Sequence, residues 1–358
     1  MKYEYWFANI KGISCRKKQQ IRTMFKNAEE IYNIEETALK KLELQEECCH
    51  KILQSVKEWK LEAEYEKLQK EQVKFYTIGD KAYPKKLKQI DSPPYAIYVK
   101  GELPREDVLS IAIVGARQCS HYGETMAKLY TKEIADAGLQ IVSGMARGID
   151  GISQRTALSL GGKSYGVLGC GVDICYPREH FALYKELEKS GGVISEQPLG
   201  MQPLPQFFPA RNRIISGLSD VVLVMEAKEK SGSLITADMA LEQGKDVYAL
   251  PGPADSGLSL GCHNLIRQGA GILLSPKDLL SELGIFHKEK LKKSTENKIL
   301  LESQEKLVYS CLDFHPKSLG ELLVATNQSV STLMGTLVGL ELKGYIKEIS
   351  KNHYVKVK

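Results

Sequence analysis

The chain has 358 residues, of which 43% are hydrophobic and 26% charged, and its formal net charge at pH 7 is +5. This length allows two or three domains with real hydrophobic cores. No apolar run approaches the length of a membrane span and the N-terminus has no apolar signal core, so we expect a cytoplasmic protein without a membrane span. The eight cysteines form no CxxC pair, which favours reduced and buried thiols, and we expect neither a metal nor a cofactor.

Helical periodicity dominates residues 1–75. The stretch Ile10–Ser14 interrupts two periodic segments, and a charged helix-like stretch extends from about Leu39 to Lys74. We expect a small N-terminal domain of the SAM or helix-hairpin-helix-like kind. Its glycine-containing hairpin either packs or touches a DNA backbone, and packing is favoured.

Short apolar runs alternate with helix-length segments in the middle of the chain. The runs are Ile111–Val114, Leu139–Val142, Ser164–Leu168, Gly192–Ile194, Val221–Val224, Asp246–Leu250 and Ile272–Leu274. This spacing is typical of an α/β fold, an extended Rossmann-like, doubly wound and mostly parallel sheet, which we assign to residues 76–287. In such a sheet ligands bind beyond the carboxyl ends of the strands.

The last part of the chain predicts a polar linker over residues 288–298 and a winged helix-turn-helix domain over residues 299–358. Ser318 and Glu321 have the spacing of a capping box. A second helix is expected up to Leu342, followed by two strand-like segments, and this is the order of a winged helix.

The stretch Ala157–Ser164, ALSLGGKS, fits a loose phosphate-loop pattern. A phosphate loop follows a strand and begins a helix. Here the order is reversed, because a helix is expected to end at Gly161-Gly162 and a strand to follow. We therefore interpret the stretch as a helix stop and not as a nucleotide site.

The loops at the carboxyl ends of the predicted strands carry glycines, hydroxyls and cations. Eight of the ten arginines lie within residues 76–287, and guanidinium groups suit bidentate phosphate contacts. Each element alone has a plain explanation, since a glycine can be a turn and Ser231 or Ser233 a helix cap. Together they predict a surface for several phosphates. Phe207 and Phe208 are expected either to stack on a base or to pack in the core.

An enzyme is the rival interpretation. Asp150, Asp173 and Glu196 lie in ligand-side loops and are possible catalytic carboxylates, although such residues more often cap helices or orient arginines. A nucleotide-processing hydrolase of the phosphoribohydrolase type is the alternative we keep open, but its Pro-Gly-Gly-x-Gly-Thr pattern is missing. A third alternative, a transcription regulator, depends on the C-terminal domain alone.

Several motifs in order resemble the DprA/Smf DNA-processing family: Ile113–Arg117, Ser143–Asp150, Phe208–Ile215, Lys230–Thr236, Pro251-Gly252 and Asn264–Ala270. The resemblance implies single-stranded DNA binding, a homodimer, protection of incoming DNA in natural transformation or recombination, loading of the RecA recombinase, and no enzymatic activity. The sequence departs from the family pattern at Ser153-Gln154, His180 and Cys262-His263.

The site for single-stranded DNA that follows from the loops and the resemblance has fifteen residues. They are Gly115, Arg117, Ser143, Gly144, Arg147, Phe207, Phe208, Arg211, Asn212, Arg213, Lys230, Ser231, Gly232, Ser233 and Thr236.

Overall fold

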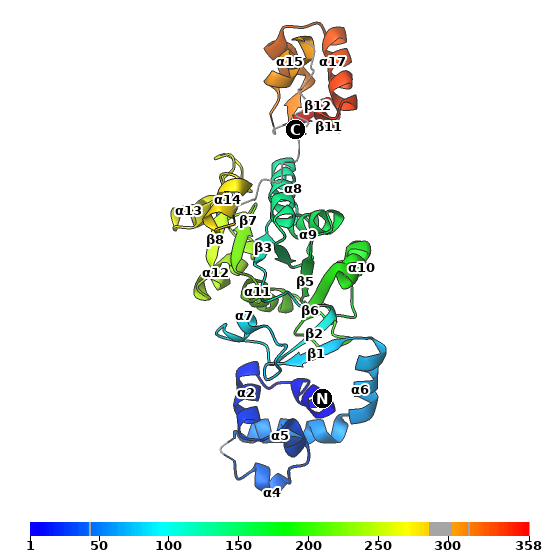
Figure 1. Ribbon diagram of the computed structural model, residues 1–358, viewed down its shortest axis with the longest axis vertical. Helices are drawn as coiled ribbons and strands as arrows, with labels where there is room; N and C mark the ends of the chain where they lie inside the picture. Colours follow the sequence, from blue (N-terminus) through cyan, green and yellow to red (C-terminus); the bar gives the residue numbers. More distant parts are fainter. Residues whose placement is uncertain (43, 286–302, 314–315, 358) are drawn as a thin grey trace. The chain divides into compact units, whose positions relative to one another are not determined.

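The computed structural model describes residues 1–42, 44–285, 303–313 and 316–357 (Figure 1). Residues 1–118 and 127–283 form one compact unit, and residues 119–126 with 284–358 form a second. The helical N-terminal part and the sheet therefore belong to one body. The predicted linker, 288–298, lies outside the described residues, and the predicted domain boundaries stay predictions.

Six helices form the N-terminal part: α1 (Lys2–Ala8), α2 (Cys15–Thr23), α3 (Ala28–Tyr32), α4 (Glu36–Leu39), α5 (Glu46–Glu58) and α6 (Leu61–Lys70). Ser14 caps α2 through the N–H of Lys17, and Trp6 and Phe7 are fully buried. The expected charged helix from Leu39 to Lys74 is interrupted. Trp59 takes an extended conformation between α5 and α6, and its ring packs edge-on against Tyr5 with centroids 5.7 Å apart.

A nine-stranded sheet forms the centre of this unit. Its strands are β1 (Lys74–Thr77), β2 (Ala96–Gly101), β3 (Ser110–Val114), β4 (Gln140–Ser143), β5 (Ser164–Leu168), β6 (Gly191–Ser195), β7 (Val221–Val224), β8 (Asp246–Ala249) and β9 (Gly271–Ile272). The spatial order is β1-β2-β6-β5-β4-β3-β7-β8-β9. Strands β3 to β9 are mutually parallel, and β2 joins them antiparallel to β6. The predicted Rossmann-like, mostly parallel sheet is confirmed.

Helices cover both faces of the sheet: α7 (Lys85–Lys88), α8 (His121–Asp136), α9 (Ile149–Ser159), α10 (Phe181–Ser190), α11 (Phe207–Gly217), α12 (Gly232–Glu242), α13 (Leu260–Arg267) and α14 (Pro276–Glu282), with a 3₁₀ turn at Arg178–His180. Val193 and Ile194 are neighbours on β6, and successive side chains on a strand point to opposite faces. Val193 shares a core with Leu187 of α10, whereas Ile194 shares another with Ile214 of α11. The helices α10 and α11 thus lie on opposite faces.

The stretch Ala157–Ser164 is a helix stop, as predicted. Helix α9 ends at Ser159, and Gly161 has a φ of +76°, which is the left-handed region that favours glycine. The N–H of Gly162 donates to the carbonyl of Ala157 at 2.9 Å, which completes a Schellman cap. Strand β5 then begins at Ser164.

The C-terminal unit contains α15 (Ser303–Cys311), β10 (Lys317–Ser318), α16 (Leu319–Thr326), α17 (Val330–Leu342), β11 (Ile346–Ser350) and β12 (His353–Lys356). Its strands pair antiparallel in the order β10-β12-β11. The capping box at Ser318 and Glu321 is present. The helices and hairpin occur in the predicted order, and the assignment to the winged-helix class stays a prediction. Among the described residues, no helix combines the length and apolar character that a membrane crossing requires.

A buried polar cluster joins α2 to the sheet. The ammonium of Lys18 donates to the carbonyl of Ala8, and the thiol of Cys15 donates to Glu196 Oε1 at 3.0 Å. Glu196 also accepts two hydrogen bonds from Arg213 Nη2, at 2.7 and 2.8 Å. Burial lowers the pKa of Lys18 from its ordinary 10.5 to about 8, with Cys15 and Glu196 acting in the opposite direction.

This cluster predicts a pH dependence of stability. Between pH 8 and pH 10.5 the unfolded state binds the Lys18 proton and the folded state does not, so Lys18 contributes a rise in the free energy of unfolding with pH across this window. Cys15, whose pKa burial raises from 9.0 to about 11, contributes a fall from pH 9 upward. Replacing Lys18 with Met removes the rise, which amounts to about 3 kcal/mol. Urea denaturation at several pH values measures it. The variant Lys17→Met, at the neighbouring and more accessible lysine, should retain the wild-type slope, and parallel curves for both variants would refute the assignment.

Candidate nucleic-acid interface

A pocket of about 710 Å³ lies at the carboxyl ends of β3 and β7. These strands are adjacent and parallel, but the chain leaves β3 toward β4 on one side and leaves β7 toward β8 on the other. The loops after the two strands diverge there, which is the position where open α/β sheets bind ligands. We call it the switch-point pocket. Predicted residues that line it are Gly115, Arg117, Arg147, Phe208, Arg211, Asn212, Lys230, Ser231, Gly232, Ser233 and Thr236.

Close backbone approach shapes the loop after β3. A Cβ on Gly115 would lie 2.7 Å from Ile149 Cγ1, and one on Gly148 would lie 2.2 Å from the carbonyl oxygen of Ala116. The loops after β3 and β4 can pack together only because both positions are glycine. Arg117 lies in the loop after β3, and its side chain is exposed. Its guanidinium carbon lies 5.9 Å from the ring centre of Phe208, within cation–π range.

The N-terminus of α12 forms another wall of the switch-point pocket. Ser231 caps the helix by accepting from the N–H of Ser233 at 3.4 Å, and the space beside Gly232 is open. Lys228 and Lys230 precede the helix and are exposed. A helix of eleven residues presents partial positive charge at its N-terminus. The helix dipole, the backbone amides and the two lysines are features that favour an anion at this position.

Phe208 and Tyr176 form an aromatic pair at the same pocket. Their ring centres are 5.4 Å apart at an interplanar angle of 37°, and Tyr176 is 43% exposed. Sequence reasoning missed Tyr176 and Lys228. Lys228 stands two residues before Lys230 and could have been included on that ground, whereas Tyr176 comes from a different loop and only the fold brings it beside Phe208.

Arg211 lies at the base of the switch-point pocket and is buried, 7% exposed. Its Nη1 donates to the carbonyl of Gly144 at 2.8 Å and to that of Val167, and Asp150 lies beside the guanidinium. Asp150 in turn accepts from the N–H of Gly144 at 3.1 Å. Burial lowers the pKa of Arg211 to about 10, while Asp150 acts in the opposite direction. The guanidinium stays charged at neutral pH and is held by the protein, where sequence reasoning expected it to face a ligand.

Four predicted residues do not line the switch-point pocket. Arg213 is directed away from it, toward Glu196 and the carbonyl of Ser92, to which its Nε donates at 2.9 Å. Ser143 is buried and donates to the carbonyl of Ile113 at 2.7 Å. Gly144 lines a smaller adjoining cavity, and Phe207 lines a different pocket. Arg211 and Arg213 therefore contact different parts of the protein, because residues two apart on a helix do not share a face. Their joint role in holding DNA stays a prediction.

The carboxylates considered as catalytic groups are engaged by the protein. Asp173 accepts from the N–H of Gly200 at 3.0 and 2.9 Å, and Glu196 is bound to Arg213. In the described parts of the chain, no group of three His, Cys, Asp or Glu side chains could hold a metal ion.

The sequence pattern of the family described as DNA recombination-mediator protein A matches residues 74–284, more than half of the chain. The chain belongs to this family. Protein Smf of Escherichia coli K12 is 46% identical over 202 residues, which are 56% of this chain but only 54% of that protein. The structure of DNA processing protein A (DprA) from Streptococcus pneumoniae matches with a TM-score of 0.66 and 34% identity, covering 79% of this chain and 98% of that one.

A second solved structure of a similar protein concerns DNA binding. DNA processing protein A from Helicobacter pylori matches with a TM-score of 0.54 and 29% identity over 60% of this chain and 98% of that one, and its structure concerns the single-stranded DNA binding mode of that protein. All residues that line the switch-point pocket lie within residues 74–284, the part of the chain that matches the family pattern.

Replacing Arg211 with Ala should destabilise the protein. The change leaves Asp150 buried without its cation and two carbonyls without a donor, so we expect the free energy of unfolding to fall by about 3–5 kcal/mol. Urea denaturation measures it. Arg178→Ala, at an exposed arginine, should change it by less than about 0.5 kcal/mol. Unchanged stability of Arg211→Ala would mean that the guanidinium does not hold the loops.

Proposed function

We propose that the chain binds single-stranded DNA in the switch-point pocket. The observation that carries this proposal is the convergence of three exposed cations, a helix N-terminus and an aromatic pair at one crevice. Arg117, Lys228, Lys230 and the first turn of α12 would hold phosphates, with the buried charge of Arg211 beneath them. Phe208 and Tyr176 would stack on a base.

Aromatic stacking favours a single strand over a duplex. Base faces are covered by neighbouring pairs in a duplex, whereas an unpaired strand can present them to a ring. The wall formed by Asn212 also supports this arrangement, because its Nδ2 donates to the carbonyl of Gly232 at 3.2 Å and fixes α11 to the N-terminus of α12. Phosphate and base contacts are thereby held in one geometry. The ligand of the Helicobacter pylori relative is of the same class.

Membership in the family supports the wider role. We infer that the chain acts as a non-catalytic homodimer that protects incoming single-stranded DNA and helps to load RecA during transformation or recombination. A nucleotide hydrolase is less well supported. Asp150 lines the switch-point pocket, but its carboxylate accepts a hydrogen bond from the N–H of Gly144 and lies beside Arg211.

A transcription regulator is also less well supported. In a helix-turn-helix protein the second helix of the motif reads base edges and phosphates, mainly through cationic and amide side chains. Helix α17, VSTLMGTLVGLEL, has Glu341 as its one charged residue and no Lys, Arg, Asn or Gln. Its exposed residues include Val330, Val338 and Leu342, which suit protein contacts better than duplex DNA.

Neutralising the exposed cations should weaken binding and its salt dependence together. In the triple variant Arg117→Gln, Lys228→Gln, Lys230→Gln, the slope of log K against log salt concentration should fall by about 2, since each lost phosphate contact contributes about 0.7. Fluorescence anisotropy with labelled oligo-dT measures it. The double variant Lys41→Gln, Lys81→Gln removes exposed lysines outside the pocket and serves as control. A wild-type slope in the triple variant would exclude this phosphate site.

Removing the ring of Phe208 should weaken binding without changing the salt dependence. We expect Phe208→Leu to cost about 1–3 kcal/mol of binding free energy, the worth of one stacked base, because the cations remain. The same anisotropy titration at two salt concentrations separates the two effects. Phe181→Leu, at a phenylalanine 58% exposed outside the pocket, should bind as the wild type does. Equal losses in both variants would argue against stacking on Phe208.

A further inference from the structure

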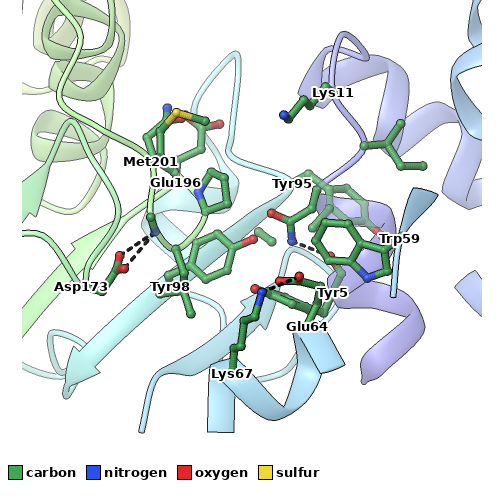
Figure 2. A pocket seen from close by; sticks show the side chains of 18 of the residues that line it. Tyr5, Lys11, Trp59, Glu64, Lys67, Tyr95, Tyr98, Asp173, Glu196 and Met201 are labelled. Carbon is green, nitrogen blue, oxygen red and sulfur yellow. Dashed lines mark hydrogen bonds and ion pairs between the residues drawn. The ribbon is translucent and has the colours of Figure 1, made fainter. Parts of the chain in front are cut away.

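A second pocket, of about 1020 Å³, lies between the N-terminal helices and the sheet (Figure 2). Residues of α1 and α6 form one side, and the loop from Glu196 to Met201 after β6 forms another. We call it the helical-side pocket. Asp173 holds this loop through the N–H of Gly200, and the N–H of Gly171 donates to the carbonyl of Met201 at 2.9 Å. These hydrogen bonds hold the loop in place, and the helical-side pocket is separate from the proposed site in the switch-point pocket.

Aromatic side chains line much of the helical-side pocket. Tyr5, Tyr95 and Tyr98 are each at most 3% exposed and form a fixed wall, which Figure 2 shows gathered beside Trp59. Trp59 and Phe207 also line the pocket but are only partly buried, so their rings remain accessible. The indole N–H of Trp59 is buried and has no hydrogen-bond acceptor among the described residues.

The charged side chains of this pocket that have no ion-pair partner among the described residues are lysines. Its carboxylates are all engaged: Glu64 by Lys67, Glu71 by Lys100, Asp173 by Gly200, and Glu196 by Arg213. Lys11 and Lys70 line the pocket, are exposed, and have no carboxylate within ion-pair distance in the described chain. Figure 2 shows the amine of Lys11 extending toward the space between the walls. Accessible aromatic rings with free ammonium groups suit a base and its phosphates.

The two pockets meet at the N-terminus of α11. Phe207 lines the helical-side pocket and its neighbour Phe208 lines the switch-point pocket. Both pockets also lie at the same sheet edge, because Asp173 and Glu196 follow β5 and β6 while Arg117 and Lys228 follow β3 and β7, and these strands are parallel. The first two residues of α11 thus line one pocket each.

We propose that the helical-side pocket is a second nucleotide site, which takes the continuation of a DNA strand bound in the switch-point pocket. A base stacks on Trp59 or Phe207, and the neighbouring phosphates meet Lys11 and Lys70. The inference rests on the proposed function of the switch-point pocket. A free nucleotide has the same chemistry, and the experiment separates the two sources.

The first measurement compares oligonucleotide lengths with the full chain. Oligo-dT of about 6 nucleotides fills one site and of about 15 spans both, within the range that single-strand binding folds occupy. The variant Lys11→Gln, Lys70→Gln should bind the short strand like the wild type and the long strand about tenfold more weakly at low salt, as expected for two exposed ion pairs. Lys41→Gln, Lys81→Gln should change neither. Equal affinity of wild type and variant for the long strand would overturn the proposal.

The second measurement uses tryptophan fluorescence, since the chain has two tryptophans. Trp6 is fully buried and its Nε1 donates to Ser55 at 2.7 Å, so a stacked base should quench Trp59 alone. We expect quenching by the long strand, none by the short strand, and none in Trp59→Phe. Quenching by dTMP but not by the long strand would overturn the strand path. Failure of both strands to bind would instead remove the proposed function itself.

Discussion

The buried guanidinium of Arg211 is the interaction on which the binding edge depends. It ties α11 to the carbonyls of Gly144 and Val167, at the ends of β4 and β5, with Asp150 compensating its charge. Helix α11 begins one turn earlier, at Phe207. The positions of Phe207 and Phe208 therefore depend on the Arg211 guanidinium. Burying this charge is costly, and several acceptors must compensate it. Without it α11 would lose its polar link to the ends of β4 and β5 and would keep its hydrogen bonds to Gly232, Ser92 and Glu196.

The cations of this edge differ in burial and in pairing, and Arg147 is exposed but forms an ion pair with Glu179. Arg211 donates to two backbone carbonyls, and Arg213 donates to Glu196 and to the carbonyl of Ser92. Arg117, Lys228 and Lys230 are exposed, and they carry charge that a phosphate can neutralise without breaking an internal pair. An exposed cation keeps part of its hydration when it contacts a phosphate. A buried cation would first have to break its internal hydrogen bonds, which costs more free energy. The proposed binding surface therefore combines exposed cations with the aromatic pair of Phe208 and Tyr176.

The sequence predicted the strands, the helix stop at Gly161-Gly162 and the loops that form the site, because each depends on local periodicity or on glycine. It did not predict which cations are free. The segment before Arg211 contains several prolines that hide the start of α11, so the sequence does not indicate the helical phase that separates Arg211 from Arg213. One departure from the family pattern, His180, is likewise explained only in space. A Cβ on Gly151 would lie 2.6 Å from Cε1 of His180, so the small residue makes room for the imidazole, whose Nδ1 lies 3.1 Å from the carbonyl of Met145.

Helix α11 also joins the two pockets into one surface. Arg211 fixes its inner side to the switch-point loops, and Arg213, two residues on, fixes another side to Glu196 and Ser92. Glu196 begins the loop that walls the helical-side pocket and also accepts from Cys15 of α2. The N-terminal helices are thereby connected to the same helix that presents Phe207 and Phe208. Both pockets share this wall, which is anchored at two points, so the fold and not the ligand sets their spacing. Binding of a single strand across both pockets would then need little ordering of the protein. Under that condition each added nucleotide can increase the affinity.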